Sequence, residues 1–227
     1  QMCIRDSVGC TGIIDFRATT EKFGELLESK GESSQVLLNH EVIDLIQNDA
    51  GTTLVTNQGK ITAKHVIYCG GLQADRLAKT DGVELDMSIL GFRGDYYELS
   101  EEGKHKVKNL IYPVPNPKFP FLGVHFTRMT DGSVECGPNA VFVFKREGYG
   151  KTDFNLKDTT DALTFPGTWK FFAKHWRFGI EEYRRAFSKS LFLSQLQRLI
   201  PDLEMKDLAH ERAGGRAMAL ADSGDII

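Results

Sequence analysis

A short segment near the middle of the chain carries residues that could bind an anion. In residues 92–97, alternate side chains of a strand would lie on one face, so Arg93, Asp95 and Tyr97 would lie together. A guanidinium on such a face can bind a carboxylate through two hydrogen bonds, with a tyrosine hydroxyl assisting. The alternative is a solvated sheet face with an Arg–Asp pair. The segment by itself leaves these two interpretations open.

A histidine is the best candidate for a base. His125 lies in the apolar, aromatic run 119–128, where a histidine is more often a satisfied core residue than a catalyst. Its ordinary pKa near neutrality still suits proton transfer at physiological pH. The six histidines and four cysteines show no HxxxH, HExxH or CxxC spacing, so we predict no metal site.

A pair of glycines marks a place where a ligand could approach the backbone. Gly70 and Gly71 follow a predicted strand, 66–69, and precede a predicted helix, 72–79. A glycine turn admits a ligand close to the main chain, and the start of a helix offers N–H groups. A tight strand-to-helix turn is the more common explanation of such a pair.

Two more polar positions follow predicted strands. Gly214 and Gly215 precede Arg216, which suits a ligand that both backbone and charge must approach, while a β-bulge explains the glycines equally well. Asn139 lies in a predicted turn, 137–140, which would present its side chain.

Composition excludes several classes of protein. The chain has 28 Lys and Arg against 31 Asp and Glu, a net charge of −3, which disfavours a nucleic-acid partner. The hydrophobic fraction of 41% suffices for a substantial core and excludes disorder of the whole chain. No apolar run reaches the roughly 18 residues of a membrane span. Scattered cysteines favour a reducing, cytoplasmic compartment.

The elements that must position these residues form two groups. The first group is predicted to contain helices over 19–30 and 72–79, β segments over 34–38 and 41–47, and a hairpin of 52–56 with 60–68 around Asn57 to Gly59. The second is predicted to contain β segments over 92–99, 110–113, 120–126, 133–136 and 140–144, and helices over 158–173, 180–187 and 189–199.

Both ends favour a fragment of a longer protein. Residues 1–10 show neither a helical nor a strand period, and we expect an artefact or an irregular lead-in there. At the other end, a polar turn leads into Ile226 and Ile227, which look like the opening of a strand.

Several motifs together resemble one enzyme family. The segments that carry this resemblance are 11–17, 69–72, 92–96, 111–149 and 213–219. They are similar to the FAD-dependent L-2-hydroxyglutarate dehydrogenase/oxidase family, within the D-amino-acid-oxidase-like flavoproteins. The similarity spans roughly residues 11–225, and the long middle motif is the most specific part.

The resemblance implies a mixed α+β and α/β fold with two lobes. One is a partial FAD-binding α/β lobe, and the other is an antiparallel β-rich substrate lobe with helices. The expected domains are a lead-in over 1–10, the FAD-binding lobe over 11–86, the substrate lobe over 87–207, and a return to the FAD-binding lobe over 208–227.

The resemblance also implies an activity, the oxidation of L-2-hydroxyglutarate to 2-oxoglutarate with hydride transfer from C2 to flavin N5. The substrate-binding candidates that it implies are Arg93, Tyr97, Asn139 and Arg216. The cofactor-binding candidates are Val42 (bordering adenosine), Gly70, Gly71, Gly214 and Gly215. The base would be His125, or a histidine of an amino-terminal part outside this chain.

The sequence departs from the family pattern in ways that keep alternatives open. No GxGxxG is present, so we expect this chain alone to hold FAD weakly and to be inactive. Met218 replaces an expected glutamine, and Gly215 replaces an apolar residue. The alternatives are a flavin amine oxidase for glycine, sarcosine or D-amino acids, and a non-catalytic interaction module. The expected partners are a small dicarboxylate and an electron acceptor, oxygen or a quinone, with peripheral association with the inner membrane left open.

Overall fold

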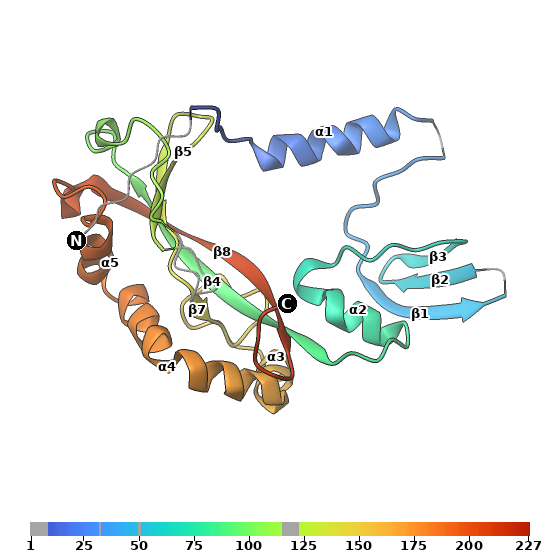
Figure 1. Ribbon diagram of the computed structural model, residues 1–227. Coiled ribbons are helices and arrows are strands. Elements are labelled where there is room, and N and C mark those ends of the chain that lie inside the picture. Colours follow the sequence, from blue (N-terminus) through green and yellow to red (C-terminus); the bar gives the residue numbers. More distant parts are fainter. Residues whose placement is uncertain (1–8, 32, 50, 115–122) are drawn as a thin grey trace. The chain divides into compact units, whose positions relative to one another are not determined.

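The chain folds into two compact units, seen in a computed structural model that describes residues 9–31, 33–49, 51–114 and 123–227 (Figure 1). The small unit is Ile14–Leu85, and the large unit is Asp86–Ile227 with the described residues before Ile14. This division falls one residue from the boundary expected at 86. Most of the expected lead-in and residues 119–122 of the aromatic run lie outside the described residues.

The small unit opens with helix α1 (Phe16–Glu28). The helix starts three residues before the position expected from the sequence, because Asp15 caps it. The Asp15 carboxylate accepts a hydrogen bond of 2.9 Å from the Ala18 amide, one of the N–H groups that no helical carbonyl can reach.

A three-stranded antiparallel sheet follows in the small unit. Its strands are β1 (Val42–Asn48), β2 (Gly51–Thr56) and β3 (Gly59–Ala63), hydrogen-bonded in the order β1-β2-β3. Gly59 has a φ of +143° directly after the two-residue turn, a conformation that favours glycine. The hairpin predicted around this glycine is therefore confirmed.

Two β segments predicted in the small unit are absent from the structure. Residues 34–38 form no strand, and β3 ends at Ala63, so residues 66–69 form none before the glycine turn. A strand is defined by its hydrogen-bonded neighbour, and no described strand pairs with either segment. The helix predicted after the turn is present, as η1 (Gly71–Gln73) and α2 (Ala74–Thr80).

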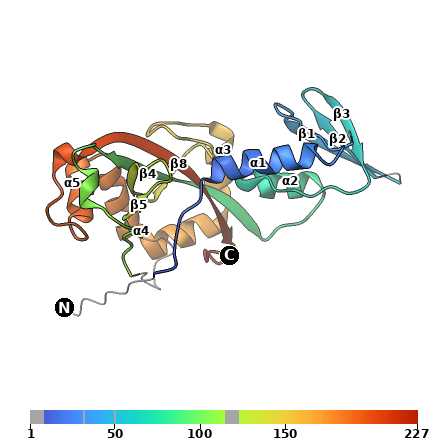
Figure 2. The same ribbon diagram turned by 90° about the horizontal axis from the view of Figure 1, so that it is seen from above.

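The large unit is built on strand β4 (Met87–Leu99). β6 (Val134–Gly137) and β7 (Val141–Phe142) pair with one edge of β4, and β5 (His125–Arg128) pairs with β6. β8 (Leu208–Ala221) pairs with the other edge, and both views show it running beside β4 (Figures 1 and 2). Every pair is antiparallel, which confirms the predicted antiparallel, β-rich lobe.

The pairing of β8 differs from two expectations. Residues 208–227 were expected to return to the first lobe, but backbone hydrogen bonds hold β8 to β4 and place it in the large unit. The register runs without interruption from Met87 opposite Ala221 to Tyr97 opposite Glu211. The β-bulge alternative for Gly214 and Gly215 is therefore wrong.

Three helices and two 3-10 turns complete the large unit. They are η2 (Lys104–Lys106), α3 (Leu156–Thr164), α4 (Pro166–Ala186), α5 (Lys189–Leu196) and η3 (Met205–Asp207). The predicted helix over 158–173 is divided at Phe165, because a residue before proline avoids helical geometry and Pro166 suits a first turn. α4 then continues through the predicted gap, with non-helical backbone angles at His175.

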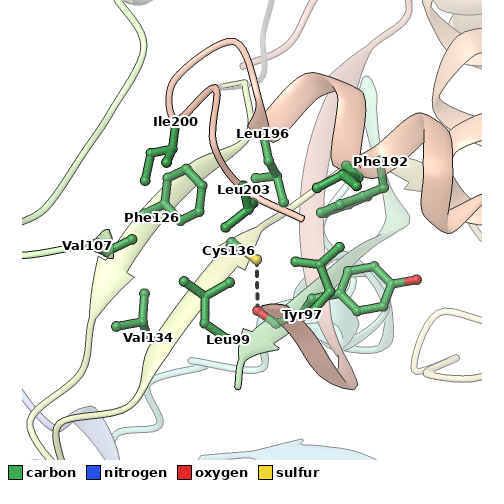
Figure 3. Close-up of a cluster of buried hydrophobic side chains, with 12 residues drawn as sticks. Tyr97, Leu99, Val107, Phe126, Val134, Cys136, Phe192, Leu196, Ile200 and Leu203 are labelled. Carbon is green, nitrogen blue, oxygen red and sulfur yellow. Dashed lines mark hydrogen bonds between the residues drawn. The ribbon is translucent and has the colours of Figure 1, made fainter. Parts of the chain in front are cut away.

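The sheet and the helices enclose two apolar cores. Figure 3 shows the first core, where Tyr97 and Leu99 of β4 meet Phe126, Cys136 and the α5 side chain Phe192. The second core contains Leu90, Phe92, Ala140, Phe142, Ala162, Phe171, Met218 and Leu220. Both cores include residues of β4, so packing holds the backbone of this strand and thereby positions the candidate residues on it.

Candidate functional site

Arg93 and Asp95 form a buried ion pair. Arg93 Nε donates to Asp95 Oδ1 at 2.7 Å, and Arg93 Nη1 donates to the carbonyl of Gly150 at 2.5 Å. Arg93 is 1% exposed and Asp95 2%, so the predicted solvated sheet face is wrong. The guanidinium of Arg93 is inaccessible to solvent, so burial gives no support to its predicted substrate contact. A buried charge needs such partners, and the pair supplies them.

Asn139 completes this buried polar network, which we define as Arg93, Asp95, Asn139 and the Gly150 carbonyl. The Asn139 amide donates to Asp95 Oδ2 at 2.7 Å, and its carbonyl oxygen accepts from the Asp95 amide, also at 2.7 Å. Asn139 is 4% exposed. The expectation that the turn presents the Asn139 side chain is wrong, because this side chain binds Asp95 of β4; its substrate contact stays a prediction.

Tyr97 belongs to the first apolar core, apart from any ligand surface. It is 6% exposed, and its ring packs edge-on against Phe192 with centroids 5.0 Å apart (Figure 3). Burial, with a further contribution from the charge of Glu211, raises its pKa to about 12. This burial gives no support to the substrate contact of Tyr97, which stays a prediction.

His125 lies in a different, half-buried setting. Its ring stacks on that of Tyr112, with centroids 4.4 Å apart and an interplanar angle of 23°. Its Nδ1 lies 3.0 Å from the carbonyl oxygen of Gly123, which can only accept a hydrogen bond. Burial, followed by the Arg216 charge, lowers the pKa of His125, although the Gly123 hydrogen bond opposes them.

Arg216, whose charge acts on His125, also interacts with Tyr96. Burial raises the pKa of Tyr96, whereas the charge and a side-chain hydrogen bond of Arg216 lower it. The charge of Tyr112 also acts on Tyr96. We call Tyr96, Tyr112, His125 and Arg216 the sheet-face cluster. Its members come from β4, from the segment before β5, from β5 and from β8.

The sheet-face cluster combines groups that can work on a hydroxy acid. Because Nδ1 of His125 donates to Gly123, the neutral ring has its lone pair on Nε2, where it can accept a proton. Burial lowers the pKa of His125, which favours the neutral ring. Arg216 is exposed on β8 and carries a fork of donors suited to a carboxylate. A cation and a base on one face match the two polar ends of such a substrate.

The sequence reasoning missed Tyr96 and Tyr112. Alternation placed Tyr96 on the face of β4 that was not considered for binding. The β8 register puts Arg212 opposite Tyr96, and the interaction of Tyr96 with Arg216, which lies opposite Phe92, is visible only in the folded chain. The local sequence around Tyr112 showed no pattern that indicated a role in the site. It reaches His125 because Ile111 and Phe126 exchange backbone hydrogen bonds of 3.0 and 2.9 Å.

Gly71 of the small unit fits contact with a dinucleotide. It has a φ of +52°, and no atom lies within 4 Å of the place where a Cβ would stand. Its backbone is therefore open to a ligand. Gly70 differs, because a Cβ there would lie 2.6 Å from Leu77 Cδ1, so a larger residue would have to displace the Leu77 side chain.

The remaining cofactor candidates are placed by the strands. Val42 is the first residue of β1, half-buried and opposite Thr56. Gly214 lies opposite Gly94, and a Cβ on it would lie 3.6 Å from the ring of Tyr96, an ordinary contact distance. Gly215 lies opposite Arg93. Their contacts with FAD stay predictions.

The described residues offer neither a metal centre nor a membrane-spanning helix. Within these ranges no three His, Cys, Asp or Glu side chains gather as ligands of a metal ion. No helix in the described part of the chain has both the length and the apolar character needed to span a bilayer.

Comparison with known proteins identifies the family. Residues 8–227 match the DAO family, described as FAD dependent oxidoreductase. The chain is 44% identical over 218 residues to L-2-hydroxyglutarate dehydrogenase of Indibacter alkaliphilus, covering 96% of this chain and 54% of that protein. It is 41% identical over 221 residues to L-2-hydroxyglutarate dehydrogenase of Escherichia coli K12, covering 97% and 52%. The chain thus spans about half the length of the curated relatives it matches.

A solved structure shows the same fold. L-proline dehydrogenase from P. horikoshii superposes with a TM-score of 0.56 at 14% identity, covering 89% of this chain and 43% of that chain. This likeness agrees with the mixed helix and antiparallel sheet architecture predicted from the sequence. Because the family match extends over nearly the whole chain, the chain belongs to the DAO family of FAD dependent oxidoreductases.

Proposed function

We propose that the protein carrying this chain oxidises L-2-hydroxyglutarate to 2-oxoglutarate with FAD as cofactor. The observation that carries the proposal is the half-buried His125 ring of the sheet-face cluster, stacked on Tyr112 with its Nδ1 on the Gly123 carbonyl, together with the exposed Arg216. The similarity at 44% and 41% identity to proteins named L-2-hydroxyglutarate dehydrogenase supports the choice of substrate.

The chain's own residues have distinct tasks in this proposal. Arg216 binds a substrate carboxylate, and Tyr96 adds a hydroxyl donor at the same place. Nε2 of His125 takes the proton of the C2 hydroxyl as the carbonyl forms. When bound, FAD supplies the acceptor for the hydride that leaves C2. The proton and the hydride together account for the two hydrogens that distinguish the hydroxy acid from the oxo acid.

Different residues are assigned to the cofactor and to the framework. Gly71 would contact FAD through its open backbone, and we keep Val42, Gly70, Gly214 and Gly215 as further cofactor candidates. The burial of Arg93, Tyr97 and Asn139 favours a structural role for these three over a substrate contact.

The proposal includes partners and a location. The substrate is a small dicarboxylate, and the electrons pass on to oxygen or a quinone. The net charge of −3 gives no support to a nucleic-acid partner. We place the protein in the cytoplasm, with peripheral association with the inner membrane when a quinone is the acceptor.

The test uses the complete, flavin-loaded protein that contains this chain. Its absorbance spectrum is recorded without oxygen during addition of L-2-hydroxyglutarate and, separately, of the D-enantiomer. Bleaching of the oxidised flavin band by the L-enantiomer alone supports the proposal. A flavin that bleaches only with glycine, sarcosine or a D-amino acid contradicts it and favours an amine oxidase. A protein that binds no flavin favours the interaction module.

A further inference from the structure

The β6 residue directly opposite His125 gives its ring no side-chain support. The residue directly opposite His125 on this strand is Gly137, which has no side chain. Directly opposed side chains are normally the closest cross-strand neighbours, so the ring lacks the support that a strand residue usually receives. The hydrogen bond from Nδ1 to the Gly123 carbonyl fixes one atom, about which the ring plane can still tilt.

Tyr112 supplies the missing support. Its ring lies nearly parallel to the imidazole at a centroid distance of 4.4 Å, which is the offset-stacked range of aromatic pairs. Its hydroxyl lies 3.1 Å from Oγ1 of Thr127. Thr127 is two residues from His125 and therefore on the same face of β5. The tyrosine thus lies across His125 and is anchored at its far end.

The backbone of Tyr112 is also fixed. Its neighbour Ile111 exchanges two hydrogen bonds with Phe126, and Phe126 is fully buried in the first core. Tyr112 itself is 46% exposed, so burial in a core does not explain its position. The contact that its ring makes with the imidazole of His125 is therefore the better explanation of its position.

We propose that Tyr112 is a positioning residue, whose ring holds the His125 imidazole so that Nε2 is presented to the hydroxyl proton. This inference rests on the proposed function, because it assigns His125 as the base. The stacked ring removes water from one imidazole face and keeps Nδ1 aligned with Gly123. The charged group that acts on His125 is Arg216 of β8, which also favours the neutral ring.

Two substitutions separate stacking from hydrogen bonding. Y112F keeps the ring and removes the hydroxyl that meets Thr127, whereas Y112L removes the ring. Y149L is the matched control, because Tyr149 is a comparably exposed tyrosine, at 55%, on another loop. The first readout is the pKa of His125 from an NMR titration of the folded protein, with H125Q identifying its signal. The second is the pH profile of kcat and KM in the flavin-loaded enzyme.

We expect Y112L to raise the His125 pKa by roughly 0.5 to 1, because water regains the exposed ring face. We expect its kcat to fall about 10- to 100-fold with KM changed less than about threefold, because the base is misplaced while the carboxylate contact stays. Y112F and Y149L should stay within about threefold of the unsubstituted enzyme in both constants.

Two results would overturn the inference. In one, Y112L leaves both the pKa of His125 and kcat unchanged. In the other, Y112F loses as much activity as Y112L, which would assign the effect to the hydroxyl. A flavin-loaded enzyme that does not oxidise L-2-hydroxyglutarate would refute the proposed function instead. The NMR titration of Y112L would then decide by itself whether the ring controls the imidazole.

Discussion

The large unit contains two polar regions built from similar residues but with opposite exposure. In the buried polar network, Arg93 is 1% exposed and is bonded to Asp95 and to a backbone carbonyl. In the sheet-face cluster, Arg216 is exposed and His125 is half-buried. Arg93 and Arg216 lie on strands that pair with each other, with Arg93 one register position from the partner of Arg216.

The difference shows that the structural environment of an arginine, and not the residue type alone, decides what the arginine can bind. A buried guanidinium whose partners are already fixed stabilises the turn and the strand around it, since removing one partner leaves an uncompensated charge. A guanidinium at the surface keeps donors that a ligand can reach. The two regions should therefore respond differently to the same substitution, in stability or in activity.

The largest expected effect concerns the base of the sheet-face cluster. H125Q keeps a side-chain amide near the Gly123 carbonyl but cannot accept the hydroxyl proton. We expect kcat to fall about 10²- to 10⁴-fold, the range of general-base contributions. The measurement is the anaerobic rate of flavin reduction by L-2-hydroxyglutarate. An unchanged rate would remove His125 from the mechanism and return the base to a residue outside this chain.

The second prediction compares the two arginines in stability. R93M should reduce the free energy of unfolding by about 3–5 kcal/mol, because it leaves Asp95 buried without its cation. R216M should change this free energy by no more than about 0.5 kcal/mol, as is usual at an exposed position. Urea unfolding of both variants measures the difference. Equal losses would show that the comparison between the regions is wrong.

The third prediction concerns ligand binding by the same arginine. R216M should weaken binding of 2-oxoglutarate about 10- to 100-fold, since it removes a charge-assisted pair of hydrogen bonds. Calorimetry on the flavin-loaded protein measures the affinity. R198M is the control, because Arg198 is an exposed arginine that bonds to Gln195 just beyond α5. If R198M weakened binding as much as R216M, the effect would be one of general charge.

The smallest expected effect is a pH dependence of stability. The folded state lowers the pKa of His125 from its ordinary 6.5, so the folded protein binds fewer protons than the unfolded chain between the two values. Stability should therefore fall as the pH falls through this window, and H125Q should fall less. His175 has a pKa lowered in the same direction, so part of the slope will remain. Unfolding midpoints at pH 7.5, 6.5 and 5.5 measure the slope, and identical slopes would contradict the prediction.

Local patterns determined much of the fold. The alternation around the 57–59 turn predicted the hairpin, and the aromatic β segments predicted the antiparallel sheet that the structure confirms, although the segment 110–113 forms only an isolated bridge at Ile111. Strand predictions were wrong where the formation of a strand depends on a hydrogen-bonded neighbour that is distant in the sequence. Residues 34–38 and 66–69 have β-rich sequence but no described strand to pair with. The assignment of residues 208–227 to the first lobe did not anticipate the pairing of β8 with β4, because this pairing is a long-range property.

The candidate site divides in the same way. The sequence by itself identified His125 and Arg216 as residues able to do chemistry and, through family resemblance, indicated FAD and a hydroxy dicarboxylate. Only the tertiary structure showed that Arg93, Tyr97 and Asn139 are buried, that Tyr112 stacks on the histidine, and that Tyr96 interacts with Arg216. Alternation tells which residues share a face of a strand, but not whether a helix, a turn or solvent covers that face. Packing between distant segments decides this, because burial is a property of the whole fold.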